Sequence, residues 1–595
     1  MTDSFVAPTI DWIYLVPILV VLGTGVVGVL VEAFVPARAR RTVQVTLALL
    51  ATAASFATIV LLWRDPAVQG DPATGGTYGV RVLGGSMVID PFGLAVQGVV
   101  VLLAFLAILV IADRTSTGQD AFAPTAAAVP GSPYEDLARR KGIEQTEVYP
   151  LVLFAVGGMM IFPATGNLLV MFVALEVLSL PLYVLSAMAR RRRLLSQEAS
   201  FKYFLLGAFA SALFVFGVAL VYGYAGTVDL AAVFQVLAGG GTPFADMPGL
   251  VLTGVLLILA GLLFKVGAAP FHAWTPDVYQ GAPTPITGFM AACTKAAAFG
   301  ALLRVLYVIS LGMAQSDPAA QEDLFVALWV VALLTMVIGT AVGAVQTDVK
   351  RLLAYSSIAH AGFILVGIIG FSQASLRATV FYLLVYGLAT VGSFAVVTLV
   401  RETAPAPERA LVDATAGVVA PGGESASAPS APTGGDPVGD DPSPAVPDAG
   451  VVLGEATHLA QWAGLGRRSP WLAGAFSLFL LSMAGIPLTA GFIAKFSAFG
   501  AAIAGPDTQG GGSTWVLAVV GVLASAVAVF FYVRIIVLMY FTAPAEDAEG
   551  VGVTVVRSRG PAAISIAVCA ALVLVLGVFP SPVLELAAEA VKFVP

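Results

Sequence analysis

Charged side chains are scarce in this sequence. Asp, Glu, Lys and Arg together make up 11% of its 595 residues, hydrophobic residues make up 58%, and the mean hydropathy is +0.94. Soluble domains carry about 25% charged residues. A chain of this length with less than half that share has too few polar groups to cover its surface. A single soluble fold is excluded, and we expect an integral membrane protein.

Cysteine and histidine are also rare, which excludes several kinds of site. The two cysteines, Cys293 and Cys569, are too few for a disulfide framework or a four-cysteine zinc site, and we interpret them as packing residues. The sequence has no Cys-x-x-Cys pair, no Gly-x-Gly-x-x-Gly fingerprint and no Gly-Lys-Ser/Thr phosphate loop. We therefore expect the chain itself to bind no cofactor and no metal, and we expect no nucleic acid partner.

Long apolar runs dominate what is present. The first begins at Trp12, after acidic Asp3 and Asp11 and without a small-residue cleavage site, so we interpret it as a retained span rather than a signal peptide. Runs long enough to cross a bilayer lie at 12–35, 42–63, 91–112, 148–165, 167–189, 200–224, 249–279, 285–311, 322–345, 352–371, 376–400, 470–502, 514–541 and 561–588. The predicted fold is all-α, a polytopic membrane protein of 14 transmembrane helices. The seventh and twelfth runs are too long for plain spans.

Basic residues gather on one side of the predicted membrane. With the N-terminus outside, the inside loops hold 19 of the 29 Lys and Arg residues, and the outside segments hold four. Cytoplasmic loops are enriched in Lys and Arg, so this bias predicts that both termini lie on the outer side. The other six basic residues fall within spans: Lys202, Lys265, Lys295, Arg304, Lys495 and Arg534.

One segment differs in composition from the rest of the chain. Residues 402–453 are rich in Pro, Ala, Gly and Ser, with eight acidic residues against the single basic Arg409. Such a segment cannot bury enough apolar surface to offset its chain entropy. We interpret it as a disordered cytoplasmic insertion.

Four charged residues lie near the middle of predicted spans. Glu176 is nine residues after Asn167, and Lys295 is ten after Pro285, which places each about 14 to 15 Å along its helix. Lys265 and Lys495 also interrupt apolar sequence. Each charge would cost about 2.5 to 3.5 kcal/mol in lipid. One lysine could reach an interface or form a structural ion pair, but the set favours a hydrated ionisable pathway inside the bundle.

Lysine suits proton movement through such a pathway. Burial lowers the pKa of a lysine from about 10.4, and an approaching carboxylate raises it again. Glu176 is the expected carboxylate partner. Lys202, four residues after Glu198, either connects this pathway to the cytoplasmic side or forms a surface ion pair with Glu198.

Prolines interrupt the two longest runs. Pro270 and Pro487 each remove a backbone donor and clash with the preceding turn, so we expect helices 7 and 12 to be broken, with Lys265 and Lys495 near the breaks. These helices hold matching positions if helices 4–8 (148–311) and helices 9–13 (322–543, with the insertion) are five-helix repeats of inverted topology. Paired interrupted helices at matching places are typical of transporters. Helices 1–3 (1–112) precede the repeats, and helix 14 (561–588) follows them.

Other polar residues have open roles. His272 and His360 could relay protons, because the ordinary histidine pKa is near neutral, or could simply pack between helices. Lys350 is a further candidate relay. Arg304 and Arg534 do not change protonation state usefully, so we expect structural or field-setting roles for them.

The residues around these lysines resemble those of a known family. The segment KVGAAPFHAWTPDVYQGAPTPITGFMAACTKAAAFGALLR (265–304) is similar to the antiporter-like membrane subunits of respiratory complex I. The resemblance also covers SQEASFKYFLLGAFASALFVFGVALVYGYAGT (196–227), QTDVKRLLAYSSIAHAGF (346–363) and AGIPLTAGFIAKFSAF (484–499). The similarity extends over most of spans 4 to 13.

The resemblance implies a fourteen-helix proton-translocating unit. It assigns the proton pathway to Glu176, Lys265, Lys295 and Lys495. The subunit N branch fits best, because subunit M has a glutamate at the twelfth-span lysine and subunit L adds spans and a long lateral helix. Subunits M and K and the lateral helix of subunit L would be neighbours, and NADH, flavin, iron–sulfur clusters and quinone would bind in partner subunits. The location implied is a bacterial plasma (inner) membrane.

Two other functions compete with this interpretation. A subunit of a multi-component cation/proton antiporter of the Mrp type shares the Lys and Glu pattern, although its relatives resemble the WTPDVYQGAPTP segment less. An assembly scaffold with no conducting role is the other, and retention of all four pathway residues weighs against it.

Overall fold

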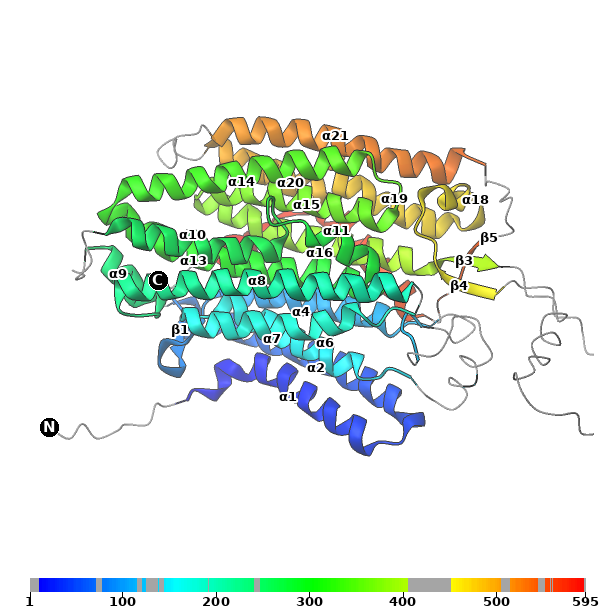
Figure 1. Cartoon of the computed structure of the whole chain (residues 1–595), viewed down its shortest axis with the longest axis horizontal. Coiled ribbons are helices and arrows are strands. Elements are labelled where there is room, and N and C mark those ends of the chain that lie inside the picture. The colour runs from blue at the N-terminus through cyan, green and yellow to red at the C-terminus, as the bar shows by residue number, and fades with distance from the viewer. Residues whose placement is uncertain are drawn as a thin grey trace, which may run out of the picture.

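The computed structural model shows a bundle of long helices that run roughly along one common direction (Figure 1). Strands β3 to β5 lie at one end of the bundle, which we call the strand end, and the short helix α9 and hairpin β1–β2 lie at the opposite end, which we call the α9 end. The structure describes residues 10–70, 78–114, 120–124, 137, 144–190, 192–239, 247–404, 451–504, 514–543, 552–556, 558 and 560–592.

The chain begins at one edge of the bundle. The first helices are α1 (Trp12–Phe34), α2 (Ala37–Trp63), the single turn α3 (Pro66–Gln69) and α4 (Pro91–Ile111). Strands β1 (Val80–Val82) and β2 (Met87–Ile89) form an antiparallel hairpin in which Arg81 is opposite Val88, joined by the turn η1 (Leu83–Gly85). The Asp90 carboxylate then caps α4 by accepting from the Gly93 amide at 2.7 Å.

The region of the first predicted repeat follows. It contains α6 (Val148–Ile161), η2 (Phe162–Ala164), α7 (Leu168–Ser186), α8 (Arg193–Ala225), α9 (Leu230–Leu237), α10 (Pro248–Val266), α11 (Trp274–Gly281), α12 (Thr284–Phe289), the π-helical turn η3 (Met290–Thr294) and α13 (Lys295–Ser316). Asn167 and Asp229 cap α7 and α9 through their side-chain oxygens. The run predicted as helix 7 is thus divided into α10 and α11.

The region of the second predicted repeat reaches the other edge of the bundle. Its helices are α14 (Pro318–Ala344), α15 (Val349–Ile369), α16 (Gln373–Leu399), α18 (Leu465–Arg468), α19 (Pro470–Ala484), α20 (Ala490–Ala504) and α21 (Thr514–Phe541), with the 3-10 turn η4 (Leu459–Trp462) before α18. Asp317, Asp348 and Ser372 cap the first three. The run predicted as helix 12 is likewise divided, into α19 and α20.

A small sheet closes the strand end, in the order β4–β3–β5. Strand β3 (Val400–Ala404) pairs antiparallel with β4 (Val451–Glu455) and with β5 (Gly552–Val555). The predicted disordered insertion 402–453 therefore differs at both ends, because its first and last three residues extend strands that satisfy their backbone groups in this sheet. Residues 405–450 of that prediction lie outside the described part of the chain.

The last predicted helix is two helices. Helix α22 (Pro561–Val578) ends before Phe579 and Pro580, and α23 (Ser581–Glu589) follows. The prediction of one helix over 561–588 missed this break. A residue before proline is disfavoured in the helical region, and Phe579 accordingly has φ −124° and ψ 67°.

The described residues contain 12 helices that are long and apolar enough to cross a membrane, and three shorter apolar helical segments at Val148–Ala164, Pro470–Ala484 and Ala490–Ala504. This confirms an all-α, multi-pass membrane fold. The count of fourteen stays a prediction. It requires the first short segment to cross alone and the other two to form one crossing together.

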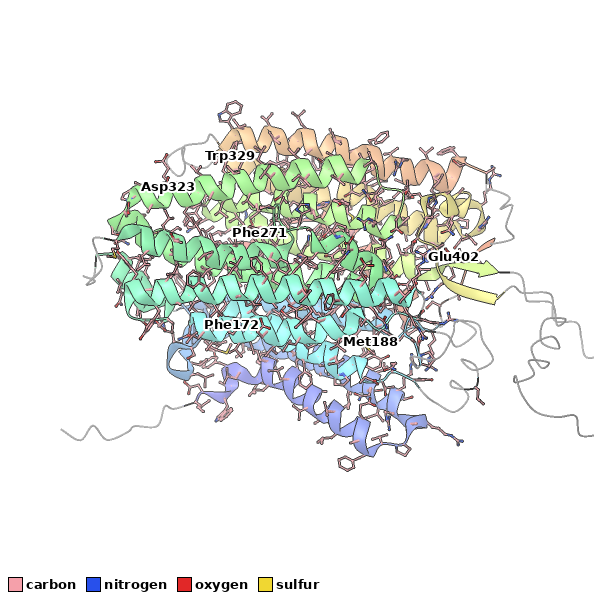
Figure 2. The ribbon with its side chains drawn as sticks, in the orientation of Figure 1. Phe172, Met188, Phe271, Asp323, Trp329 and Glu402 are labelled. Atoms are coloured by element: carbon pink, nitrogen blue, oxygen red, sulfur yellow. The ribbon has the colours of Figure 1, made fainter. Side chains whose placement is uncertain are left out.

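The core lies at α15 and α16. In both, 94% of the most apolar 18-residue window is buried, against 33% in α1 and α2 and 39% in α21. Figure 2 shows Phe271, in the interruption between α10 and α11, well inside the length of the bundle, and Glu402 at the strand end. A charged side chain on α15 or a neighbouring core helix is thus surrounded by protein rather than lipid.

Candidate functional site

Both interrupted helices end in the same backbone motif. Gly267 after α10 and Gly485 after α19 have φ of 72° and 84°, in the left-handed region that favours glycine. The following amides reach back across the last turn, Ala268 to the Leu263 carbonyl at 3.0 Å and Ile486 to the Leu481 carbonyl at 3.1 Å. Each interruption therefore exposes the negative end of a helix dipole inside the bundle.

Lys265 lies in the last turn of α10 among aromatic rings. Its side chain is 1% exposed. Its Nζ lies 5.4 Å from the ring centre of Tyr183 and 5.3 Å from that of Tyr203, and 3.5 Å from the Tyr183 hydroxyl. Trp274 stacks on Tyr203 with 4.7 Å between ring centres. These rings stabilise an ammonium through their quadrupoles without neutralising it.

Glu176 does not form the expected direct pair with Lys265. Its half-buried carboxylate accepts a hydrogen bond from Ser211 of α8 at 2.5 Å, and within the described chain no ion pair joins it to a lysine. Tyr183 follows Glu176 by two turns on the same face of α7, and the charge of Glu176 acts on both Tyr183 and Lys265. The structure thus places the Tyr183 hydroxyl, on the same helix as Glu176, beside the Lys265 ammonium.

Lys295 lies directly after the π-helical turn η3. It is 1% exposed, and its ammonium donates to the Ser357 carbonyl of α15 at 2.5 Å and lies 5.8 Å from the ring centre of Tyr386. Short π-helical turns within α-helices occur frequently at functional sites. The turn carries Lys295 into the most buried part of the bundle.

His360 connects the surroundings of Lys295 to those of Lys495. Its Nδ1 lies 2.9 Å from the Tyr382 hydroxyl and its Nε2 lies 3.4 Å from the Tyr532 hydroxyl. The charges of Lys295 and Lys495 both act on the ring. Both ring nitrogens therefore face groups that can donate or accept, which suits a proton relay.

Lys495 is held at the second interruption. Its ammonium donates to the last-turn carbonyls of α19, Met483 at 2.8 Å and Ala484 at 3.1 Å, and to the Ser525 hydroxyl at 2.7 Å. The ring of Phe363 lies 4.7 Å away. The side chain is 5% exposed. The negative end of the α19 dipole thus stabilises the ammonium in place of a carboxylate.

The remaining candidates lie toward the strand end or at the first interruption. Lys202 pairs with Glu198 at 2.6 Å, as one interpretation predicted, and also with Asp277 of α11 at 2.8 Å. Lys350 is buried and donates to the Ala282 carbonyl at 2.6 Å. His272, in the α10–α11 interruption, is half-buried, and its Nδ1 has no hydrogen-bond partner in the described structure.

Sequence reasoning missed the tyrosines. Tyr183, Tyr203 and Tyr386 surround two of the lysines, yet a tyrosine in an apolar run resembles any other packing residue. One signal was available, because Tyr183 is seven residues after Glu176 and therefore on the same helix face. Tyr203 and Tyr386 lie on helices other than those of the lysines they contact, so no spacing in the sequence indicates these contacts.

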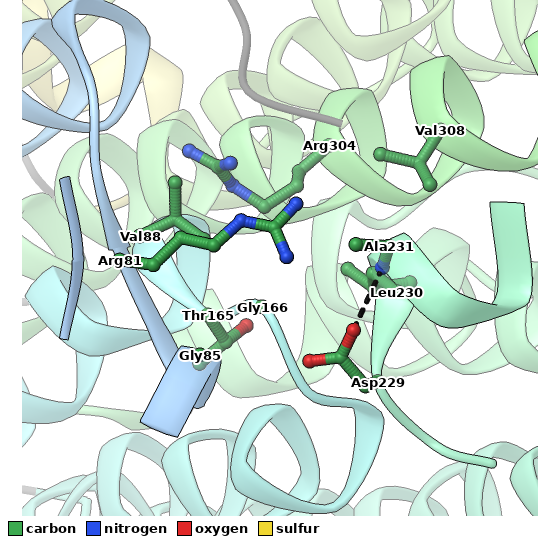
Figure 3. Close-up of a pocket in the computed structure, with 10 residues that line it drawn as sticks. All are labelled: Arg81, Gly85, Val88, Thr165, Gly166, Asp229, Leu230, Ala231, Arg304 and Val308. Atoms are coloured by element: carbon green, nitrogen blue, oxygen red, sulfur yellow. Dashed lines mark hydrogen bonds between the residues drawn. The ribbon is translucent and has the colours of Figure 1, made fainter. Parts of the chain in front are cut away.

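Arg304 and Arg534 have structural contacts. The Arg304 guanidinium forms a buried ion pair with Asp90 at 2.7 Å, and Arg534 donates to the carbonyls of Ala344 and Gln346. Figure 3 shows that Arg304 and Arg81 reach one side of a pocket at the α9 end, with Asp229 opposite. Arg304 thereby joins α13 to the start of α4.

Replacing Arg304 with leucine should destabilise the protein. Asp90 would stay buried without this partner, and breaking a buried ion pair in this way costs about 3 to 5 kcal/mol. We expect a lower melting temperature of the detergent-solubilised assembly, and less of it. Arg81→Leu, at an exposed position in the same pocket, is the control. Equal falls in melting temperature for Arg304→Leu and Arg81→Leu would contradict a special stabilising role of the Arg304–Asp90 ion pair.

Comparison with known proteins agrees with this geometry. The family model "NADH:quinone oxidoreductase/Mrp antiporter, TM" matches residues 165–414 and 450–528. Proteins named NADH-quinone oxidoreductase subunit N are similar over nearly their whole length: that of Beutenbergia cavernae is 56% identical over 99% of this chain and 100% of its own, and that of Mycobacterium tuberculosis is 44% identical over 98% and 99%.

Solved structures show the same fold. A chain of respiratory complex I from Thermus thermophilus with bound aureothin matches with a TM-score of 0.67 and 29% identity, over 96% of this chain and 99% of that one. A chain of the Mrp complex from Dietzia sp. matches with a TM-score of 0.68 at 21% identity, over 97% of each chain, which shows the fold alone. The chain therefore belongs to the subunit N family of NADH-quinone oxidoreductases.

Proposed function

We propose that this chain translocates protons as a membrane subunit of NADH:quinone oxidoreductase, along an axis formed by Glu176, Lys265, Lys295, His360 and Lys495. The observation that carries this proposal is that its three lysines are at most 5% exposed and, in the described structure, none has a carboxylate within ion-pair distance. A lysine buried without a counter-ion can gain or lose its proton when its neighbours move.

The energy must come from outside the chain. Moving one charge against the membrane potential costs about 2.3 kcal/mol per 100 mV, and this chain's own residues do not supply it. Hydride and electron transfer, with NADH, flavin, iron–sulfur clusters and quinone, would occur in partner subunits. Within this chain, we propose that a movement of the Tyr183 side chain, which contacts Lys265, changes how strongly the Glu176 carboxylate stabilises the ammonium.

The broken helices support an inverted-repeat mechanism. The helices α10–α11 and α19–α20 end their first halves in the same motif, and each presents a lysine near the break. We propose that helices 4–8 and 9–13 are inverted repeats, with Lys295 and His360 connecting their two halves. Lys202 and His272 would lie outside the connection between Lys265 and Lys495.

We propose an orientation with the strand end in the cytoplasm. Arg40, Arg192 and Arg351 lie at or near the starts of helices at this end, Arg401 lies in β3, and Arg468 ends α18. Segments on the cytoplasmic side of a membrane protein are enriched in basic residues. Both termini would then lie on the outer side of a bacterial plasma membrane. Subunits M and K and the lateral helix of subunit L are the proposed neighbours.

A subunit of an Mrp-type antiporter remains the second candidate, since the Mrp complex shares the fold. Mild-detergent purification of the tagged chain separates the two. Recovery of dehydrogenase subunits with inhibitor-sensitive NADH:quinone reductase activity would support the proposal. Recovery of only other antiporter-type membrane subunits would replace it with the antiporter.

A Lys295→Met variant tests the axis itself. Methionine keeps the length of the side chain but cannot carry a proton, so we expect NADH-driven proton pumping in inverted membrane vesicles to fall by about a hundredfold or more, at or above the low end of the range for loss of a proton-transfer group. Lys592→Met is the control, because Lys592 lies over Tyr78 far from the axis. Full pumping by an assembled Lys295→Met complex would remove Lys295 from the pathway.

A further inference from the structure

A cavity at the strand end is lined by Lys350 and Glu455. Its wall includes Arg192, Gln280, Ala282, Lys350, Glu455 and Thr457. The cavity therefore brings together the start of α8, the end of α11, the start of α15 and strand β4. Among the described residues of this wall, Glu455 is the only carboxylate, and its side chain is 19% exposed.

We propose that this cavity takes up protons from the cytoplasm, with Glu455 as the collecting carboxylate and Lys350 as the next carrier toward Lys295. This proposal rests on the proposed function, since it supplies the axis with its protons. A proton from water in the cavity would join the Glu455 carboxylate and then pass to the neutral amine of Lys350. Only O–H and N–H bonds change, so no other reactant is needed.

The charges around Glu455 favour its ionised form. Arg401 lies 3.8 Å away on the neighbouring strand, Lys350 faces the carboxylate from α15, and Arg190 faces it from the segment after α7. Burial opposes ionisation, but these positive charges outweigh it and hold the pKa of the Glu455 carboxyl below its ordinary value. The group is therefore an acceptor at neutral pH.

Buried hydroxyls near Lys295 lie two turns along α15 from Lys350. Ser357 is seven residues after Lys350 on the same face of α15, about 10 Å along the helix, and its carbonyl accepts the Lys295 ammonium. Its hydroxyl lies near those of Tyr279 and Tyr386. The Ser357 and Tyr386 hydroxyls have no hydrogen-bond partner of ordinary geometry in the described structure. Buried hydroxyls without protein partners are places where ordered water bridges.

A purely structural role for Glu455 makes a different prediction. Arg401 and Glu455 are directly opposite in the β3–β4 pairing, so their ion pair could simply fasten the two strands. If so, Arg401→Gln and Glu455→Gln should have equal effects. If Glu455 collects protons, Arg401→Gln leaves the carboxylate in place and should preserve turnover.

The test uses the whole complex in inverted membrane vesicles, whose cytoplasmic face meets the medium. We expect Glu455→Gln to slow coupled NADH oxidation and proton pumping by about a hundredfold in alkaline medium, the low end of the range for loss of a proton-transfer group. The deficit should shrink as the medium is acidified, because protons then become abundant. Glu455→Asp should restore most of the rate, and Arg401→Gln and Glu402→Gln should keep it.

Two results would overturn the proposal: a deficit that is equal at every pH, or an Arg401→Gln variant as slow as Glu455→Gln. Failure here is distinct from failure of the proposed function. If protons reach the axis by a route other than Glu455, Lys295→Met would still abolish pumping. If a Lys295→Met complex pumps normally, the proposed axis is wrong.

Discussion

A Lys265→Arg variant should assemble normally and lose proton pumping. Arginine keeps the positive charge that the rings of Tyr183 and Tyr203 surround, but its guanidinium cannot release a proton in a protein. The expected fall in pumping is about a hundredfold or more, as for loss of a proton-transfer group. The loss would show that titration of this side chain, and not its charge alone, is what the pathway requires.

The measurement compares NADH oxidation and acidification in the same inverted vesicles. Lys592→Arg serves as the control for the exchange itself. Lys265→Met is neutral and similar in length to lysine, so it tests whether the larger size of arginine causes the loss. Lys265→Arg and Lys265→Met should both lose proton pumping. A Lys265→Arg complex that pumps at the normal rate would exclude protonation of this side chain from the mechanism.

Much of the fold followed from the sequence because membrane spans have a strong local signal. Apolar runs predicted the helices to within several residues, and Pro270 and Pro487 predicted the two interruptions. The break at Pro580 was missed, although the same reasoning applies to it. The strands at the ends of the insertion could not be predicted, because β3 pairs with β5 from a segment about 150 residues away.

The candidate site was predictable only in part. A lysine within an apolar run stands out by its transfer cost alone, so Lys265, Lys295 and Lys495 were identifiable. Their partners were not. The carbonyls that hold Lys495 belong to the end of α19, and the carbonyl that holds Lys295 belongs to α15. Every residue has a backbone carbonyl, so the sequence does not show which carbonyls bind a lysine.

Glu176 shows the limit of reasoning by charge. The opposite signs of Glu176 and Lys265 predicted a direct pair, but Ser211 takes the carboxylate and Tyr183 lies beside the ammonium. Spacing along one helix indicates which face a residue shares and says nothing about which helix packs against that face. The separation matters for function, since a closed ion pair would hold its proton too firmly to pass it on.

A Lys495→Arg variant should also stop pumping, for a reason that differs in detail. The ammonium is held by carbonyl oxygens at the negative end of the α19 dipole, and a guanidinium there would keep those hydrogen bonds but never release a proton. Ser525→Ala, which removes one neutral partner of the ammonium, should have a smaller effect, because Lys495 can still release its proton and the Met483 and Ala484 carbonyls still hold it.

Combining the two arginine variants distinguishes one path from two. If a proton must pass Lys265, Lys295, His360 and Lys495 in series, the first block already sets the rate. Lys265→Arg with Lys495→Arg should then pump within about twofold of either single variant, since residues that act as a unit are strongly non-additive. If the two lysines served separate half-channels with their own exits, each single variant would keep about half of the pumping and only the pair would abolish it. The contacts of His360 with Tyr382 and Tyr532, between the surroundings of the two lysines, favour the series.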